Sequence, residues 1–426
     1  MRAYFRRTFF ALENPQFRTL WLGTLFSFLG MQMQVIARGF LAFDLTNKNS
    51  ALGAVMLAFG VPQLLLVLWG GVLADRLPKR NVLVVAQGVV ALNSAWLAVM
   101  IASGAVEFWM LIVAGVVQGA GFSFIGPARQ AFISDLVEKD AIGNAVVLQQ
   151  LSMNSTRVVG PSLAGAFIAI QFIGVGGVYF MTTLGFVVAM LTMLRLPPGR
   201  PHPSVVRGSP LSEMLDGLRY VRSRPSVALL ILTSLAVVML GFPYQSFLPS
   251  IAKDVYNVGS GGLGALSSAG AVGAVAATVL VAMYAGHRYA WHFQAILALA
   301  FALSLVALGA AHSFAFGIGA MVLVGAMASA FQSLNNSLTM SLSDHQYVGR
   351  VQSISMMSWS LFGLVALPIG FIADHIGIQE TLMLMGAVVL ACVLALQALL
   401  GRLPSVARDR QLEPALPEHL AGAPGR

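Results

Sequence analysis

Arg157 lies about midway along an apolar stretch, residues 142–171, that is long enough to cross a membrane as a helix. Its guanidinium is too far from both ends of that helix to reach either surface. Gln150, Asn154 and Pro161 fall on the same helix face. Because polar groups inside a membrane are costly, this face is predicted to line a substrate cavity. The alternative is an arginine that fixes helix packing by bonding backbone carbonyls.

Seven further polar or aromatic side chains lie inside apolar stretches and are candidates for the same cavity. They are Gln34, Arg38, Gln118, Tyr244, Gln332, Asn336 and Trp359. Such a mixture of aromatic and hydrogen-bonding groups suits a large amphipathic ligand. For the aromatic residues, helix packing or lipid contact is an equal alternative. Arg38 could also extend outward toward Asp44 and Lys48.

Residues for other kinds of chemistry are scattered along the chain. The seven histidines are spread over connections on both sides of the predicted membrane, and the single cysteine, Cys392, lies inside an apolar stretch. They form no cluster with acids that could serve catalysis or hold a metal. The sequence also has no G-x-x-x-x-G-K-[ST] phosphate loop. We therefore predict no catalytic residues, no metal, no cofactor and no ATP-driven pumping.

The composition indicates what positions these side chains. Of the 426 residues 58% are hydrophobic and only 10% are charged, too apolar for a soluble globular protein. Twelve apolar stretches predict an all-α membrane protein with twelve transmembrane helices in a lipid bilayer. The net charge of +9 is carried by bases in alternate connections, which favours a membrane surface over nucleic acid as the partner.

The predicted helices divide into two groups of six. Residues 1–195 form the first bundle and residues 226–401 the second. A proline-rich linker with a short amphipathic helix, residues 196–225, joins them, and residues 402–426 are predicted to be a disordered tail. The side that carries most of the bases is predicted to be cytoplasmic, which places both termini there and the protein in a bacterial inner membrane.

The connection between the second and third predicted helices, Gly71–Arg80, reads G-V-L-A-D-R-L-P-K-R. It suits a tight turn at the membrane surface, with Asp75 closing one helix end and the bases Arg76, Lys79 and Arg80 lying toward anionic head groups. The stretch resembles the signature loop of the major facilitator superfamily, G-x-x-x-D-R-x-G-[RK]-[RK], with Pro78 at the usual second glycine.

That resemblance implies two pseudo-symmetric six-helix bundles that rock about a central site, with this loop as a gating hinge. Asp75 would then face the N-terminus of the eleventh helix, near residues 349–351, where the helix dipole favours an anion. Arg76 or Arg80 would pair with Asp135. Both contacts would hold the cytoplasmic side shut.

Two other segments extend the resemblance. Gly160, Pro161 and Gly165 are similar to the G-P-x-x-G-G element that bends the fifth helix of proton-driven antiporters, although Ala164 replaces one glycine. Residues 41–46 and 127–131 look most like the branch of enterobactin and macrolide exporters. The R-x-x-Q-G pattern of proton-coupled members is incomplete, because Gly115 stands where its arginine would be.

The sequence thus predicts a secondary active transporter that exports a small amphipathic molecule, neutral or anionic, such as a siderophore or drug. Protons are the expected coupling ion, although no acid lies at mid-membrane depth. The alternatives are a metabolite facilitator or importer of the same fold, and a membrane receptor or assembly partner that does not transport.

Overall fold

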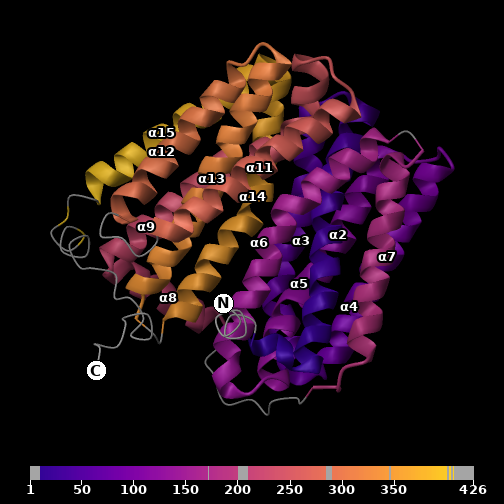
Figure 1. The fold of residues 1–426 in the computed structure, drawn as a ribbon, viewed down its shortest axis with the longest axis vertical. Helices are drawn as coiled ribbons and strands as arrows, with labels where there is room; N and C mark the ends of the chain where they lie inside the picture. Colours follow the sequence, from indigo (N-terminus) through magenta and orange to yellow (C-terminus); the bar gives the residue numbers. More distant parts are fainter. Residues whose placement is uncertain are drawn as a thin grey trace, which may run out of the picture. The chain divides into compact units, whose positions relative to one another are not determined.

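The computed structural model describes residues 10–170, 172–199, 210–284, 290–344, 347–400, 403 and 406, and all regular structure in these ranges is helical (Figure 1). The chain forms two compact units. Unit 1 comprises residues 1–207, 246–268 and 366–374, and unit 2 comprises residues 208–245, 269–365 and 375–426.

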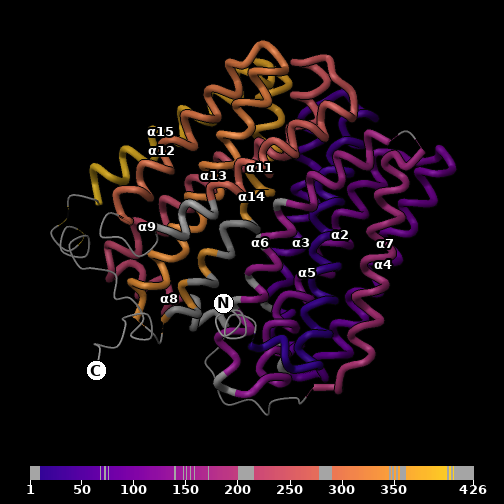
Figure 2. Tube along the Cα trace, viewed as in Figure 1, coloured from indigo at the N-terminus to yellow at the C-terminus, as the bar shows by residue number. Residues whose placement is uncertain are grey.

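Six long helices make up most of unit 1 and are drawn from indigo to magenta in Figure 2. They are α2 (Pro15–Thr46), α3 (Asn49–Arg76), α4 (Lys79–Ala102), α5 (Phe108–Leu136), α6 (Lys139–Ala169) and α7 (Gly174–Leu194), preceded by the short turn η1 (Phe10–Glu13). α3 packs on α5, α4 on α5 and α7, and α2 on α6 and α7. The side chain of Asn14 caps α2 by accepting from two backbone N–H groups, and Pro15 begins the helix.

Unit 2 holds most of the remaining helices. They are α8 (Pro210–Ser223), α9 (Pro225–Ala236), α11 (Ser260–Tyr284), α12 (Ala290–Gly309), α13 (Phe314–Leu342), α14 (Val348–Ile376) and α15 (Ile378–Leu399). The first residues of α11 and the last turns of α14 belong to unit 1. α8 lies where the sequence predicts an amphipathic helix after the linker.

The helical membrane fold is confirmed. Among the described residues, ten helical segments are long and apolar enough to cross a membrane. Two further helices, α6 and α14, are 31 and 29 residues long, which completes the predicted twelve. The predicted domain boundaries are not tested by this arrangement and stay a prediction.

One local prediction is corrected: the hinge is not a ten-residue loop, because α3 continues to Arg76 and α4 begins at Lys79. Two helices continue through prolines. α5 runs past Pro127 to Leu136, and the helix that begins at Pro225 forms one span as far as Val255. Beyond Ala236 this span consists of the short helical turns η2 (Val237–Gly241), η3 (Phe242–Phe247), α10 (Leu248–Ser250) and η4 (Ile251–Val255). Two prolines in this segment, Pro243 and Pro249, lack the N–H groups that a regular helix needs.

Glycines allow α3 and α5 to approach closely. A methyl group at Gly119 would overlap the Phe59 carbonyl oxygen, and one at Gly70 would overlap the Ser123 carbonyl oxygen. Gly126 lies on α5, as Gly119 does, but a methyl group at Gly126 would have nothing within 4 Å.

We expect Gly119→Ala to destabilise the purified protein by about 1–3 kcal/mol, because the added methyl group overpacks the helix contact. Gly126→Ala is the matched control and should cost nothing, since alanine favours the helix. Thermal unfolding in detergent measures both. Equal midpoints for the two variants would contradict the close packing of α3 on α5.

Candidate functional site

The hinge end of unit 1, defined here by Asn14, Arg76–Arg80 and Asp135, holds a buried ion pair. The Nζ atom of Lys79 lies 2.9 Å from Oδ2 of Asp135, and the two side chains are 2% and 9% exposed. Lys79 is the first residue of α4, and Asp135 lies in the last turn of α5. The pair therefore ties together the ends of two membrane helices.

Residues 196–199, at the start of the predicted linker between the two bundles, lie beside this pair. The backbone N–H of Arg80 donates to the Pro198 carbonyl at 3.2 Å, and its guanidinium donates to the Leu196 carbonyl at 3.3 Å. Gly199, at a positive φ of 76°, lies so close to Asp135 that an added methyl group would be 3.2 Å from Oδ2. The ion pair is thus largely screened from solvent, as the low exposure of both side chains indicates.

The hinge prediction is therefore partly wrong. Lys79, rather than Arg76 or Arg80, pairs with Asp135. The reason is the position of the helix start: Lys79 points toward α5, Arg80 points toward the linker, and Arg76 is exposed at the end of α3. Gly71 lies inside the last turns of α3, and the side chain of Asp75 is outside those that the structure describes.

Three of the predicted cavity residues meet in a buried hydrogen-bond network between α2, α4, α5 and α7. The Arg38 guanidinium donates to the Gln118 side-chain oxygen. Gln118 Nε2 donates to Gln34 Oε1 at 2.7 Å. Gln34 Nε2 donates to the hydroxyls of Ser94 at 2.6 Å and Thr182 at 2.9 Å. The network joins four helices of unit 1.

Arg38 is only 3% exposed, so the alternative that it extends outward to Asp44 is wrong. Its guanidinium also acts electrostatically on Tyr179, a fully buried residue of α7. Among the described residues, Arg38 Nε has no hydrogen-bond partner. The sequence analysis missed Ser94, Thr182 and Tyr179, because helix periodicity does not show which helices are neighbours.

This network permits a test of the buried charge. We expect Gln118→Leu to destabilise the protein by about 1.5–3 kcal/mol, because it removes the acceptor of a buried guanidinium. Adding Arg38→Met should recover part of that loss, since no unpaired charge then remains buried. Thermal unfolding of the two single variants and the double variant measures the coupling. Additive losses would show that the two side chains do not interact.

A second buried arginine lies nearer the hinge end. Arg129 of α5 is 6% exposed, and its guanidinium carbon lies 4.3 Å from the ring centre of Phe28, a cation–π contact. Its Nε and Nη1 atoms have no hydrogen-bond partner among the described residues. Phe28 also contacts Phe122, whose ring packs edge-on against Phe186. An aromatic ring, itself part of a cluster of phenylalanines, therefore lies against this charge.

Arg157 lies at the edge of the face of α6 that packs on α2, about 60° round the helix from Gly160. The packed face of α6 includes the buried residues Gln149, Thr156 and Gly160, and Gly160 lies against Gln32 of α2. Arg157 follows Thr156 by about 100° round the helix and is only partly buried. Pro161, one turn on, is also partly buried.

Two neighbours in the predicted α6 stripe, Gln150 and Asn154, have side chains outside the described set. Gly165 packs tightly on the backbone of Gly264, a residue of α11 that belongs to unit 1. The glycine of the predicted bend thus serves close helix packing.

The candidates in unit 2 are less closely connected. Tyr244 is buried, with its ring 6.3 Å from that of Phe301 on α12. Gln332 and Asn336 are partly buried on α13, next to Asn335, which accepts a hydrogen bond from Gln294 at 2.9 Å. The Trp359 side chain lies outside the described set.

Unit 2 also has an ion pair that the sequence analysis missed. Arg224 donates to both carboxylate oxygens of Asp344 at 3.0 Å, and the Tyr220 and Tyr347 rings stack 4.1 Å apart. The Asp344 N–H donates to the Tyr220 hydroxyl at 2.8 Å. These contacts attach α8 to the connection between α13 and α14. The signal was present in the sequence: Ser-Asp stands in the last turn of α5, at residues 134–135, and directly after α13, at residues 343–344.

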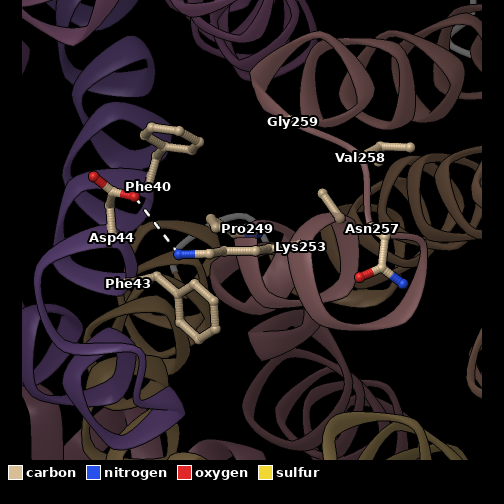
Figure 3. A pocket seen from close by; sticks show the side chains of 9 residues that line it. Phe40, Phe43, Asp44, Pro249, Lys253, Asn257, Val258 and Gly259 are labelled. Atoms are coloured by element: carbon tan, nitrogen blue, oxygen red, sulfur yellow. Dashed lines mark ion pairs between the residues drawn. The ribbon is translucent and has the colours of Figure 1, made fainter.

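At the opposite end of unit 1 is a pocket of ≈ 320 Å³ between α2 and η4, which we call the far-end pocket (Figure 3). Its walls include Phe40, Phe43 and Val258. Lys253 lies 3.6 Å from the Asp44 carboxylate and donates to Asn47 at 2.8 Å. Among the described residues, no group of three or more His, Cys, Asp or Glu could hold a metal ion.

The sequence matches the family described as "Transmembrane secretion effector" over residues 7–421. The chain belongs to this family of major facilitator superfamily transporters. It is 26% identical over 355 residues to a staphyloferrin A transporter of Staphylococcus aureus, a match that covers 81% of this chain and 86% of the relative. It is 21% identical over 390 residues to macrolide efflux protein A of Streptococcus pyogenes, covering 88% and 93%.

A likeness of fold accompanies these matches. The crystal structure of the nucleoside transporter NupG superimposes with a TM-score of 0.72, at 12% identity, covering 90% of this transporter and 99% of NupG. The predicted major facilitator fold is confirmed. The resemblance to enterobactin and macrolide exporters is also confirmed, because relatives with both names match.

Proposed function

We propose that this transporter exports a small amphipathic compound, anionic or neutral, across a bacterial cell membrane by alternating access, with protons moving inward. The observation that supports the proposal is the charge inside the first six helices. They contain Arg38, Arg129 and Arg157, whereas every acid of residues 10–195 lies in a connection or in the first or last turn of a helix. A cavity with basic groups and no acid favours an anion over a cation.

The relatives support the same class of cargo. Their names refer to a siderophore and to macrolide drugs, and the family is described by secretion. Carried over to this chain, they favour export of a siderophore or drug-like molecule. The proposed cavity comprises Gln34, Arg38, Gln118, Gln150, Asn154, Arg157, Tyr244, Gln332, Asn336 and Trp359.

In this proposal the hinge end is cytoplasmic, as the bases of the connections indicate, and both termini lie there. The Lys79–Asp135 pair keeps α4 and α5 together as a rigid part. Asp75 would then act on the positive end of the eleventh helix when the cytoplasmic side closes.

The proposal is tested by efflux from preloaded cells of a bacterial host whose own exporters are deleted. The panel contains a polycarboxylate siderophore, a catecholate siderophore, a macrolide and a cationic dye. We expect faster energy-dependent loss of at least one of the first three compounds than in empty-vector cells. Faster uptake instead would favour an importer, and no effect of any compound would favour a receptor that does not transport.

A further inference from the structure

Two helices of the chain end on the same short pattern. α3 ends with G-V-L-A-D-R, residues 71–76, and α14 has G-F-I-A-D-H, residues 370–375, one residue before its end. Each places an acid, Asp75 or Asp374, in the last turn of its helix, followed by a base. The sequence analysis treated only the first as a hinge.

The second acid has observed partners in unit 1. One Asp374 carboxylate oxygen accepts from the Asn49 N–H at 2.6 Å, and the other accepts from the Ser50 N–H at 3.0 Å. These are the first two residues of α3, whose N–H groups have no partner within their own helix. Residue 48, the N-cap, makes no side-chain capping bond. Asp374 thus supplies the negative charge that the positive end of α3 favours.

The backbones of the two helices touch at the same place. A methyl group at Gly370 would lie 2.6 Å from the Asn49 carbonyl oxygen, and one at Gly53 would overlap the Ala366 carbonyl oxygen. Ala373, the residue of α14 before Asp374, is 3% exposed. The last turns of α14 therefore close tightly on the first turns of α3, and only glycine fits at the contact.

We propose that Asp374 is a latch that holds the far end of the transporter closed by capping α3. The inference rests on the proposed function, because alternating access requires the two ends to close in turn. α3 would then take part at both of its ends: its own Asp75 closes the hinge end, and the Asp374 of α14 closes the far end. A cap of this kind changes an equilibrium by about tenfold, small enough to be broken in each cycle.

The test measures the opening directly and needs no substrate. Spin labels are placed on cysteines at the exposed positions Lys48 and Ile372, in a Cys392→Ser background, in lipid nanodiscs. Pulsed electron resonance gives the distribution of label distances. We expect the native chain to be mostly in the short-distance population, and Asp374→Ala to raise the ratio of long to short distances about tenfold.

A second variant removes the other partner. Asn49→Pro deletes one of the two N–H donors, and proline is accepted at the first position of a helix. Residue 48 already has the extended backbone that precedes proline, at φ −127° and ψ 134°. Asn49→Pro should shift the distances in the same direction as Asp374→Ala, and the double variant should be no more open than Asp374→Ala alone.

Glu107→Ala is the matched control, an acid at the far end whose carboxylate bonds only its neighbour Trp109 among the contacts of the described residues. It should leave the distance distribution unchanged. An unchanged distribution in Asp374→Ala, or an equal shift in Glu107→Ala, would overturn the latch. A distance shift with no efflux of any compound would instead contradict the proposed function alone.

Discussion

Lys79→Ala is expected to destabilise the folded transporter by about 3–5 kcal/mol, the largest loss among the hinge variants. The cause is the Asp135 carboxylate, which is 9% exposed and would lose the buried ammonium group 2.9 Å away. Gly199 lies close beside this carboxylate. The effect should appear as a lower thermal unfolding midpoint of the purified protein in detergent.

Two comparisons separate this pair from the other bases of the hinge. Arg76→Ala should have little effect on stability, because Arg76 is exposed and surface charges contribute little. Replacing both partners, in Lys79→Met with Asp135→Leu, should recover much of the loss, since no unpaired charge remains buried. An Arg76→Ala loss as large as that of Lys79→Ala would contradict the assigned pair.

Arg157→Ala is expected to reduce transport at least tenfold while the protein stays folded and abundant in the membrane. The fully buried residues of the packed face of α6 are Gln149, Thr156 and Gly160, and we expect their contacts to remain when the partly buried Arg157 is truncated. An interaction of the guanidinium with an anionic substrate contributes about 1.5–3 kcal/mol, which corresponds to at least a tenfold change in rate or affinity.

The matched variants are Arg157→Lys and Ser155→Ala. Lysine keeps the charge and should retain part of the transport, although it lacks the planar fork of arginine. Ser155 is exposed on the same turn, and its truncation should have no effect. Normal transport by Arg157→Ala at equal abundance would show that the arginine serves helix packing or lipid contact.

Much of the fold could be predicted from sequence because apolar length is a strong signal. The short helix predicted within residues 196–225 corresponds to α8, which begins at Pro210. The helix type was harder to predict: Pro127 leaves α5 regular, whereas the span from Pro225 changes to short π- and 3-10-helical turns between Val237 and Val255. Both contain proline, and neighbouring helices decide whether the freed backbone groups are satisfied.

For the site, the sequence predicted individual polar residues but not the contacts between them. Arg38, Gln34 and Gln118 were identified as polar groups inside apolar stretches, and the structure brings them together. Their partners Ser94 and Thr182 carry no signal of their own, because hydroxyl groups commonly bond their own helix.

The ion partner of Asp135 could not be predicted because it depends on where α4 begins. A shift of one residue turns a helical side chain by about 100°, enough to exchange the roles of Lys79 and Arg80. Asp374 was overlooked for a different reason: its partners are backbone N–H groups, which leave no trace in the sequence.

Coupled export is tested most directly in inverted membrane vesicles with an acidic interior and a pH-reporting dye. Adding a transported anionic or neutral compound should dissipate the pH gradient faster in vesicles with the native chain than in empty-vector vesicles. Vesicles with Arg157→Ala should respond like the empty vector. Uptake of a labelled compound without any loss of the gradient would contradict proton antiport, and no uptake of any compound would contradict export itself.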